Sequence, residues 1–245
     1  MRVNLAIDYG NSSVKVAIFD GERLIAAKRM ATLNAAEVKA LAPECSVRHA
    51  IYSTVRAADA NVAEAVGLRA DDVMVLDHNT HVPLSIEYAT PATLGHDRIA
   101  AAVGAAFTAQ GQDCLIVDAG TAMTLDVVTA DRRFLGGNIS PGMRMRFEAL
   151  HSHTGRLPLV DACGDIPMIG YDTATAIRSG VALGIAGEIE STIRRVSKQY
   201  GDNLKVILTG GDCRLIANLV DADVSVDEHL LMKGLNRILL YNEKI

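Results

Sequence analysis

Two segments of the chain place an aspartate and a glycine between apolar runs, in an arrangement that could bind phosphate. The first reads LAIDYGNSSVKVAIFDGERLI and contains Asp8 and Gly10, and the second reads LIVDAGTAMTLDVVTADRRFL and contains Asp118 and Gly120. The glycines would let backbone N–H groups approach phosphate oxygens without a Cβ in the way. The aspartates would repel phosphate, so each is expected to act through a metal ion or its waters. The alternative is an ordinary turn in which each aspartate hydrogen-bonds to its own backbone.

The two segments repeat one pattern at an offset of 110 positions, which aligns Asp8 with Asp118 and Gly10 with Gly120. Each copy has the pattern of a strand, Asp-x-Gly, short polar residues, a second strand, a polar turn and a third strand. A duplication explains this agreement better than coincidence does. It predicts two similar halves, each opening with three strands, with a cleft between them.

A third element, KVILTGGDCRLIANLV, predicts a strand, a glycine turn and a helix that opens at Asp212. Such a turn lets the backbone approach a ligand, and the helix N-terminus favours negative groups. Two Asp-x-Gly hairpins and this turn are typical of the acetate/sugar kinase, Hsp70 and actin superfamily. That resemblance implies an α/β fold with duplicated ribonuclease H-like (actin-like ATPase) domains, residues 1–112 and 113–245. Both hairpins would face the phosphates of ATP in the cleft, and the third turn would hold its adenosine.

The composition limits the classes of protein to which the chain can belong. Its 245 residues are 49% hydrophobic and carry a net charge of −5, which argues against disorder and against a nucleic-acid-binding surface. The four cysteines form no CxxC pair and the histidines lack a metal-binding spacing, so no disulfide framework or zinc site is expected. No apolar run is long enough to span a bilayer, and a strand pattern begins too early for a signal peptide. We therefore expect a soluble, cytoplasmic protein without membrane or nucleic-acid partners.

Strand and helix patterns alternate along the chain, as in α/β proteins. Strands are predicted at residues 3–7, 14–19, 24–28, 49–53, 73–76, 114–117, 123–128, 133–136 and 205–209. Helices are predicted at residues 35–41, 60–66, 97–109, 145–151, 173–200, 214–219 and 230–241. The helix over 173–200 is rich in glycine and alanine, which lowers its intrinsic stability unless another element packs closely against it. That element could belong to the same subunit or to a second one.

Gly95, His96, Asp97 and Arg98 stand directly before an alanine-rich helical pattern. An aspartate there could serve only to stabilise the helix N-terminus, with the arginine in solvent. In its full set of motifs, however, the chain resembles the type III pantothenate kinases over nearly all of its length. The motifs that carry the resemblance are Asp-x-Gly-Asn-[Ser/Thr] at 8–12, Tyr88, Gly-x-Asp-Arg at 95–98, Asp-x-Gly-Thr at 118–121, Gly-Gly-x-Ile-x-Pro-Gly at 136–142 and Gly-x-Asp-Thr at 170–173.

The resemblance implies that the protein uses ATP to phosphorylate the terminal hydroxyl of pantothenate, the first step towards coenzyme A. Asp97 would be the general base, and the pantothenate site would comprise Tyr88, Gly95, His96 (without a catalytic role), Arg98 and, from the other subunit of a homodimer, Thr173. ATP would be bound by Asp8, Tyr9, Gly10, Asn11, Ser12, Ser13, Val14, Lys15 and Thr121. Asp118 would bind a monovalent cation, potassium or ammonium. Asp8 would bind Mg²⁺ through a water molecule.

General chemistry supports several of these roles. Phosphoryl transfer has a loose transition state, so Asp97 would mainly orient the hydroxyl and accept its proton late, contributing about 10²–10⁴-fold. Arg98 offers a planar, permanently charged partner for a small carboxylate substrate. Lys15 aligns with Leu125 in the repeat, so the second loop lacks a lysine and a cation at Asp118 would supply the missing charge.

Two other functions are compatible with parts of the pattern. One is phosphorylation of a small sugar or carboxylate by a kinase of the same superfamily, which Tyr88 and the Gly-x-Asp-Arg segment argue against. The other is a non-enzymatic, nucleotide-gated binding protein, which would need a peptide-binding domain or insertions for which this chain lacks the length. Ser12 stands where many relatives have threonine, and it keeps the hydroxyl.

Overall fold

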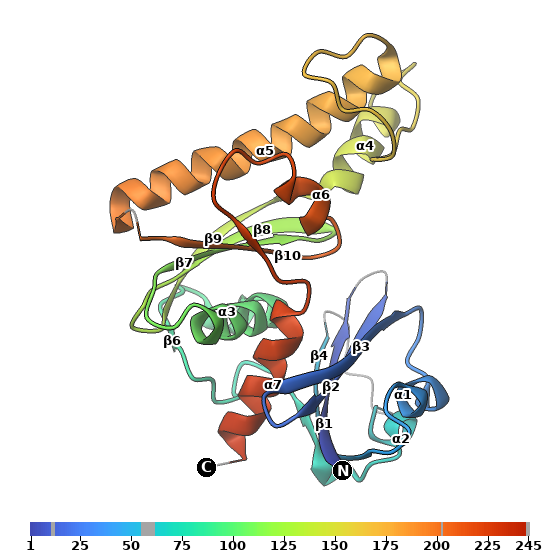
Figure 1. The fold of residues 1–245 in the computed structure, drawn as a ribbon, viewed down its shortest axis with the longest axis vertical. Coiled ribbons are helices and arrows are strands. Elements are labelled where there is room, and N and C mark those ends of the chain that lie inside the picture. The colour runs from blue at the N-terminus through green and yellow to red at the C-terminus, as the bar shows by residue number, and fades with distance from the viewer. Residues whose placement is uncertain (11–12, 55–61, 202, 244–245) are drawn as a thin grey trace. The chain divides into compact units, whose positions relative to one another are not determined.

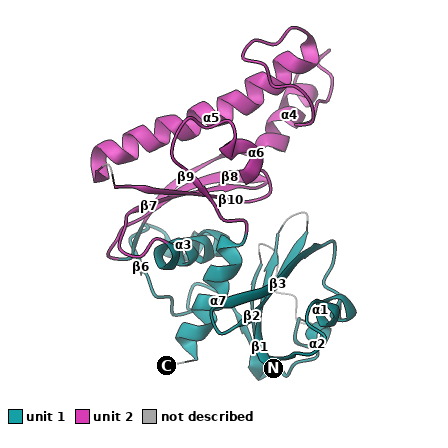
Figure 2. Cartoon of the chain, viewed as in Figure 1, with its two compact units in different colours: residues 1–108, 132–134, 229–245 teal, residues 109–131, 135–228 magenta. Residues whose placement is uncertain are grey.

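The first Asp-x-Gly segment folds into a three-strand meander that begins a five-stranded sheet (Figure 1). The structure is a computed structural model that describes residues 1–10, 13–54, 62–201 and 203–243. The chain divides into two compact units (Figure 2). Unit 1 comprises residues 1–108, 132–134 and 229–245, and unit 2 comprises residues 109–131 and 135–228.

The sheet of unit 1 has the strand order β3-β2-β1-β4-β5. Its meander is antiparallel, and β4 and β5 then add in parallel on the other side of β1. Alternating residues of β1 and β2 bury their side chains with residues of the first helix, which is the pattern of a sheet face that packs against a helix. The elements are β1 (Arg2–Tyr9), β2 (Val14–Asp20), β3 (Arg23–Met30), α1 (Ala35–Leu41), β4 (Ser46–Thr54), α2 (Val62–Val66), η1 (Ala70–Asp72) and β5 (Val73–Val75).

Two further helices of unit 1 cross each other with their backbones in close contact. A Cβ added to Gly104 in α3 (His96–Thr108) would lie 2.3 Å from the Leu230 carbonyl oxygen, at the start of α7 (Leu230–Asn242). A Cβ added to Gly234 would lie 1.7 Å from the carbonyl oxygen of Ala100. Chain order alone assigned 230–241 to the second half, whereas this packing gives α7 to unit 1.

Unit 2 repeats the strand order, with β9-β8-β7-β10-β11 matching β3-β2-β1-β4-β5, so the predicted duplication is confirmed. Helices α4, α5 and α6 lie over one face of this sheet (Figure 1). The two-residue strand β6, preceding the short turn η2, pairs with the first residues of β9. The elements of unit 2 are β7 (Cys114–Ala119), β8 (Ala122–Val128), β9 (Arg133–Pro141), α4 (Met143–Ser152), α5 (Thr173–Tyr200), β10 (Lys205–Thr209), α6 (Cys213–Ala217) and β11 (Ser225–Val226). β6 (Ser85–Ile86), η2 (Pro91–Thr93) and the first two residues of β9 belong to unit 1.

The two meanders differ in register at their turns. Asp8 pairs with Lys15, whereas Asp118 pairs with Thr124, so the second turn is one residue shorter. The alignment matched Lys15 with Leu125, which is instead buried in the core. The residue opposite Asp118 is uncharged in either register, so the second loop still lacks the lysine of the first.

Helix α5 separates its small residues by face. Ala182 and Ala186 are buried in the core of unit 2, while Gly180, Gly184 and Gly187 are exposed. Among the described residues, no heavy atom beyond the helix's own backbone lies within 4 Å of a Cβ built on any of these three glycines. The alanines therefore serve packing within the subunit, and the three glycines are exposed with open space beside them.

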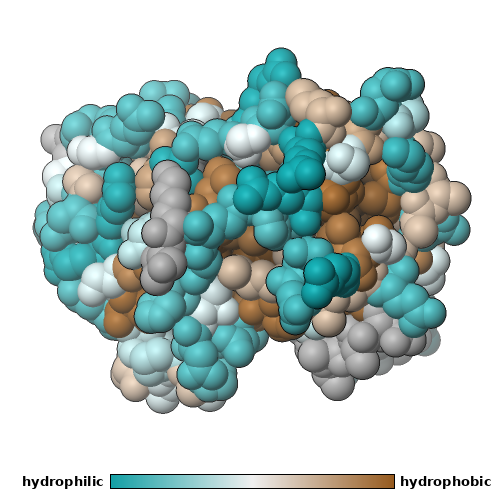
Figure 3. Space-filling model, turned by 90° about the horizontal axis from the view of Figure 1, so that it is seen from below, coloured by the Kyte–Doolittle hydropathy of each residue, from teal (hydrophilic) through white to brown (hydrophobic). Residues whose placement is uncertain are grey.

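The face shown in Figure 3 is mostly hydrophilic, with hydrophobic residues interspersed. None of the helices formed by the described residues is long and apolar enough to cross a membrane.

Candidate active site

The carboxylate of Asp8 lies at the end of β1, buried beside the end of β4. Ser53 pairs with Asp8 in the parallel register, and its Oγ donates a hydrogen bond of 2.8 Å to Asp8 Oδ1. Lys15, opposite on β2, has its Nζ 3.9 Å from Asp8 Oδ2. Burial raises the pKa of Asp8, the Lys15 charge and the Ser53 bond oppose that rise, and the charge of Asp97 adds to it. Asp8 and Asp97 are therefore close enough to interact electrostatically within unit 1.

Asp97 lies in the first turn of α3, at the N-terminal end of the helix. Its Oδ1 accepts a hydrogen bond of 2.8 Å from the backbone N–H of Arg98. A Cβ on Gly95 would lie 2.4 Å from the same oxygen, so the carboxylate occupies space that only glycine leaves open. This explains in physical terms why the Gly-x-Asp-Arg motif needs its glycine. His96, between them, is half-buried at the first position of the helix.

The guanidinium of Arg98 is buried against two aromatic rings. Its Cζ lies 5.4 Å from the ring centroid of Tyr88 and 5.7 Å from that of Phe134, and the two rings are 6.2 Å apart. The side chains come from the segment after β6, the first turn of α3 and the start of β9. The predicted substrate-binding residues Tyr88, Gly95 and Arg98 and the predicted base Asp97 are thus brought together in unit 1.

The first Asp-x-Gly turn is closed by its own backbone, since the N–H of Gly10 donates to the Ser13 carbonyl at 3.1 Å. Ser13 Oγ accepts a 2.6 Å bond from Arg29 Nε on β3. Tyr9 packs edge-on against Tyr52, and the Val14 side chain is buried in the core. Of the predicted nucleotide-binding residues, Asn11 and Ser12 lie outside the described residues.

The second Asp-x-Gly loop is held by two other glycine-containing segments of unit 2. A Cβ on Gly210 would lie 2.5 Å from Asp118 Oδ1, so the predicted glycine turn after β10 contacts the loop directly. A Cβ on Gly142 would lie 2.2 Å from the Gly120 carbonyl oxygen, and the N–H of Gly142 donates to the Thr121 carbonyl at 3.1 Å. Asp118, the exposed Thr121 and the turn after β10 therefore form one cluster of backbone and carboxylate oxygens.

A cavity of about 490 Å³ opens beside this cluster. Its lining includes the apolar side chains of Met143, Phe147 and Val160, and Asp212 at the start of α6. The backbone N–H of Asp212 donates to the Ala119 carbonyl, which joins the cavity to the second loop. Sequence reasoning identified the glycine turn but not the α4 wall of this cavity.

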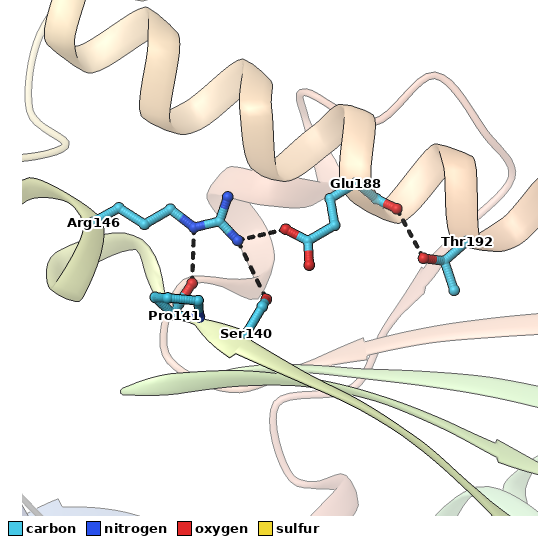
Figure 4. Close-up of polar contacts among 5 residues, drawn as sticks. All are labelled: Ser140, Pro141, Arg146, Glu188 and Thr192. Carbon is cyan, nitrogen blue, oxygen red and sulfur yellow. Dashed lines mark hydrogen bonds and ion pairs between the residues drawn. The ribbon is translucent and has the colours of Figure 1, made fainter.

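Arg146 of α4 fixes the end of β9 to helix α5 (Figure 4). Its Nε donates to the Pro141 carbonyl at 2.8 Å, and its Nη2 donates to Ser140 Oγ at 3.3 Å and to Glu188 Oε2 at 2.5 Å. The next residue after Pro141 is Gly142, which supports the second Asp-x-Gly loop. Arg146 therefore braces the segment on which that loop rests.

Thr173 is exposed at the first position of α5. Asp172 caps this helix by accepting the Thr175 N–H at 2.7 Å, and Thr175 Oγ1 accepts the Asp172 N–H in return. A Cβ on Gly170 would lie 2.3 Å from the Cα of Ala176. Gly170 and Asp172 of the Gly-x-Asp-Thr motif thus have structural roles, and Thr173 is exposed.

Comparison with known proteins shows the family to which the chain belongs. The family model for type III pantothenate kinase matches residues 4–195. The chain belongs to the type III pantothenate kinase family. The Type III pantothenate kinase of Phocaeicola vulgatus is 41% identical over 243 residues, which cover 99% of this chain and all of the relative.

Solved structures show the same fold in more distant proteins. A conserved putative Baf family transcriptional activator from Campylobacter jejuni superposes with a TM-score of 0.60 at 24% identity, covering 98% of this chain and 100% of that one. The activator of the 2-hydroxyisocaproyl-CoA dehydratase from Clostridium difficile, solved with bound ADPNP, superposes with a TM-score of 0.55 at 12% identity, covering 98% of this chain and 93% of that one. The recognised family and the α/β fold are confirmed, and the chain is a kinase by its membership of the type III pantothenate kinases.

Three residues beside the candidate site were not found from the sequence. Ser53 and Phe134 each contact a predicted site residue, Asp8 or Arg98, from a distant part of the chain. Arg146 binds the end of β9, directly before Gly142 of the predicted motif. Ser53 ends a predicted strand with a small polar residue, which is a usable signal in a parallel sheet. Phe134 and Arg146 carry no local signal of their roles.

Proposed function

We propose that this kinase transfers the γ-phosphoryl group of ATP to the terminal hydroxyl of pantothenate, with Asp97 as the general base. The observation that carries the proposal is the placement of the Asp97 carboxylate against Gly95, in the same unit as Asp8, Lys15 and Arg98. Such a set supplies a base, a cation-binding carboxylate and two cationic side chains, which phosphoryl transfer to a carboxylate-bearing alcohol requires.

Asp97 would accept the proton of the attacking hydroxyl late in the reaction. Its Oδ1 is occupied by the Arg98 N–H, which fixes the plane of the carboxylate and leaves Oδ2 for the hydroxyl. The guanidinium of Arg98 would bind the carboxylate of pantothenate, and the Tyr88 ring, stacked beside it, would line the same site. Fixed orientation of both ends of the substrate is the main contribution that the protein can make to a loose transition state.

The nucleotide would be bound by residues of both Asp-x-Gly loops. Residues 8–15 of the first loop, which include Lys15, would contact its phosphates. In the second loop, Thr121 would contact the ATP. The cavity beside Asp212 would hold its adenosine, since its apolar lining suits a base and its polar rim a ribose.

Two cations belong to the proposal. The Asp8 carboxylate, oriented by Ser53, suits Mg²⁺, which proteins commonly bind through one or two carboxylates together with the substrate phosphates. Magnesium would neutralise charge that develops on the phosphates. The oxygens of Asp118 and Ala119 that meet at Gly210 are hard donors that suit a potassium or ammonium ion.

The working form would be a cytoplasmic homodimer in which Thr173 reaches the partner's pantothenate. The exposed Gly180, Gly184 and Gly187 of α5 support this arrangement, because helices pack most closely where side chains are absent. Replacing Gly184 by Leu should shift the protein to monomers in sedimentation velocity, and replacing the open loop residue Gly155 by Leu should not. A monomeric wild-type protein would contradict this part of the proposal.

Substrate choice tests the proposed reaction. ADP release should be measured with pantothenate, a panel of sugars and short hydroxy acids, in potassium, ammonium or sodium buffer with Mg²⁺. Among these acceptors, only pantothenate is expected to be phosphorylated, and its turnover should depend on potassium or ammonium. Turnover with a sugar but not with pantothenate would overturn the proposal and favour a sugar kinase of the same superfamily.

A further inference from the structure

The aromatic contacts of Arg98 include one residue that has no place in the proposed reaction. Phe134 is fully buried, and the Arg98 side chain beside it is only 6% exposed. The Cζ of Arg98 lies 5.7 Å from the Phe134 ring centroid, within the range of a cation–π contact. A buried guanidinium needs partners that hold its charge, and this ring is one of them.

The chain builds this contact from parallel strand pairing. Ile86 of β6 pairs with Phe134 of β9, and the N–H of Glu87 donates to the Phe134 carbonyl at 2.9 Å. The Glu87 carboxylate is also paired with Arg133 at 3.3 Å. Pairing of the two strands thus fixes the backbone from which the Phe134 ring projects and, two residues beyond Ile86, the backbone that leads to Tyr88.

We propose that Phe134 is a positioning residue for substrate specificity, because its ring holds the Arg98 guanidinium in the orientation that recognises a carboxylate. The inference rests on the proposed function, in which Arg98 binds the carboxylate of pantothenate. Contacts with ring faces restrain the plane of the guanidinium while its N–H groups, which lie in that plane, can point to a carboxylate. Phe134 itself does not touch the reacting atoms.

A purely structural role for Phe134 predicts a different result. Loss of core packing would lower stability and reduce the amount of active enzyme, which changes kcat and leaves KM values alone. Loss of Arg98 orientation would weaken ground-state and transition-state binding of the carboxylate equally, which raises the KM for pantothenate and leaves kcat alone.

The test compares Phe134→Leu with wild type and with Phe107→Leu. Phe107 is a matched control because its ring also contacts arginines, which are residues other than Arg98. The Cζ atoms of Arg132 and Arg237 lie 4.4 and 3.9 Å from its ring centroid. Initial rates give kcat and KM for pantothenate, for ATP, and for panthenol, in which a hydroxymethyl group replaces the carboxylate. Thermal unfolding of each variant reports its stability.

Phe134→Leu should raise the KM for pantothenate about 5- to 30-fold and leave kcat and the KM for ATP within about twofold. The preference for pantothenate over panthenol should fall by a similar factor, and Phe107→Leu should change none of these ratios. An unchanged KM for pantothenate in folded Phe134→Leu would overturn this inference and leave the proposed function standing. If that variant does not fold, Phe134→Met, which keeps volume without a ring face, decides in the same way. Wild-type enzyme without pantothenate turnover would overturn the proposed function and this inference together.

Discussion

Replacing Gly95 by alanine should disable the base while leaving the fold intact. The added Cβ would lie 2.4 Å from Asp97 Oδ1, whereas the other neighbouring atoms are at ordinary distances of 3.6 and 3.7 Å. Gly95 does not have the left-handed backbone conformation that would strain alanine. The clash is therefore relieved by rotation of one carboxylate rather than by movement of the backbone.

The size of the effect follows from how far the carboxylate must move. An ordinary contact of 3.4 Å requires Oδ1 to move by about 1 Å, which also breaks its bond with the Arg98 N–H. A displacement of about 1 Å at a reacting group can reduce a rate about 10²-fold. We expect kcat to fall by about this factor, with a melting temperature close to that of wild type.

Steady-state kinetics and thermal unfolding of Gly95→Ala test this expectation. Gly155→Ala is the control, since a Cβ there meets open space. In an Asp97→Asn background the Gly95→Ala change should have little further effect, because both act on the same group. Near-normal turnover of Gly95→Ala, or equal further loss in the Asp97→Asn background, would refute the role given to this pair.

Three further predictions concern unit 2. Gly142→Ala should destabilise the fold by about 1–3 kcal/mol and weaken nucleotide binding, because the added Cβ meets backbone oxygens of the second loop. Urea unfolding measures the loss of stability, and ADP titration measures the loss of binding. Arg146→Met should lower the free energy of unfolding by about 1–3 kcal/mol, because three hydrogen bonds of a mostly buried guanidinium are lost. Arg144 pairs with Glu148 on the exposed surface, so Arg144→Met should have almost no effect on this free energy. Bonds from Thr175 lower the pKa of Asp172 below its ordinary 3.8, so the stability it adds is present above pH 3.8 and is lost as pH falls through the lower folded value. The stability difference between wild type and Asp172→Asn should therefore shrink on acidification below pH 3.8, and a difference that grows there would contradict the capping role.

Local signals in the sequence predicted most of the secondary structure. The helix over 173–200 has its predicted ends because Asp172 caps its start and Gly201, with a φ of 97°, stops it. The predicted helix over 35–41 is also confirmed, and Asn34 caps it. The strands β6 and β11 were missed because two residues are too few to show a period. The first two positions of the helix predicted at 60–66 lie outside the described residues.

The repeat predicted the architecture because both copies retain the same strand order. It could not predict which unit α7 joins, since that depends on a backbone contact between Gly104 and Gly234 far apart in sequence. The register of the second turn also escaped prediction. A turn one residue shorter leaves the pattern of apolar residues almost unchanged.

The candidate site was predictable where its residues are adjacent in sequence. Gly95, Asp97 and Arg98 form one short motif, and the structure adds a steric reason for its glycine. Ser53 and Phe134 reach the same site through strand pairing, which a single sequence does not specify. Long-range pairing, rather than local propensity, therefore accounts for most of what was missed.

One measurement tests the central claim most directly. Pantothenate and ATP should be mixed with excess enzyme, and the reaction should be quenched at short times and analysed for 4'-phosphopantothenate. Nucleotide affinity should be measured separately on the same enzyme preparations. Wild type should form this product, and Asp97→Asn should form it about 10²–10⁴-fold more slowly with unchanged nucleotide affinity. Absence of the product with wild type, or equal rates for the two proteins, would contradict the account.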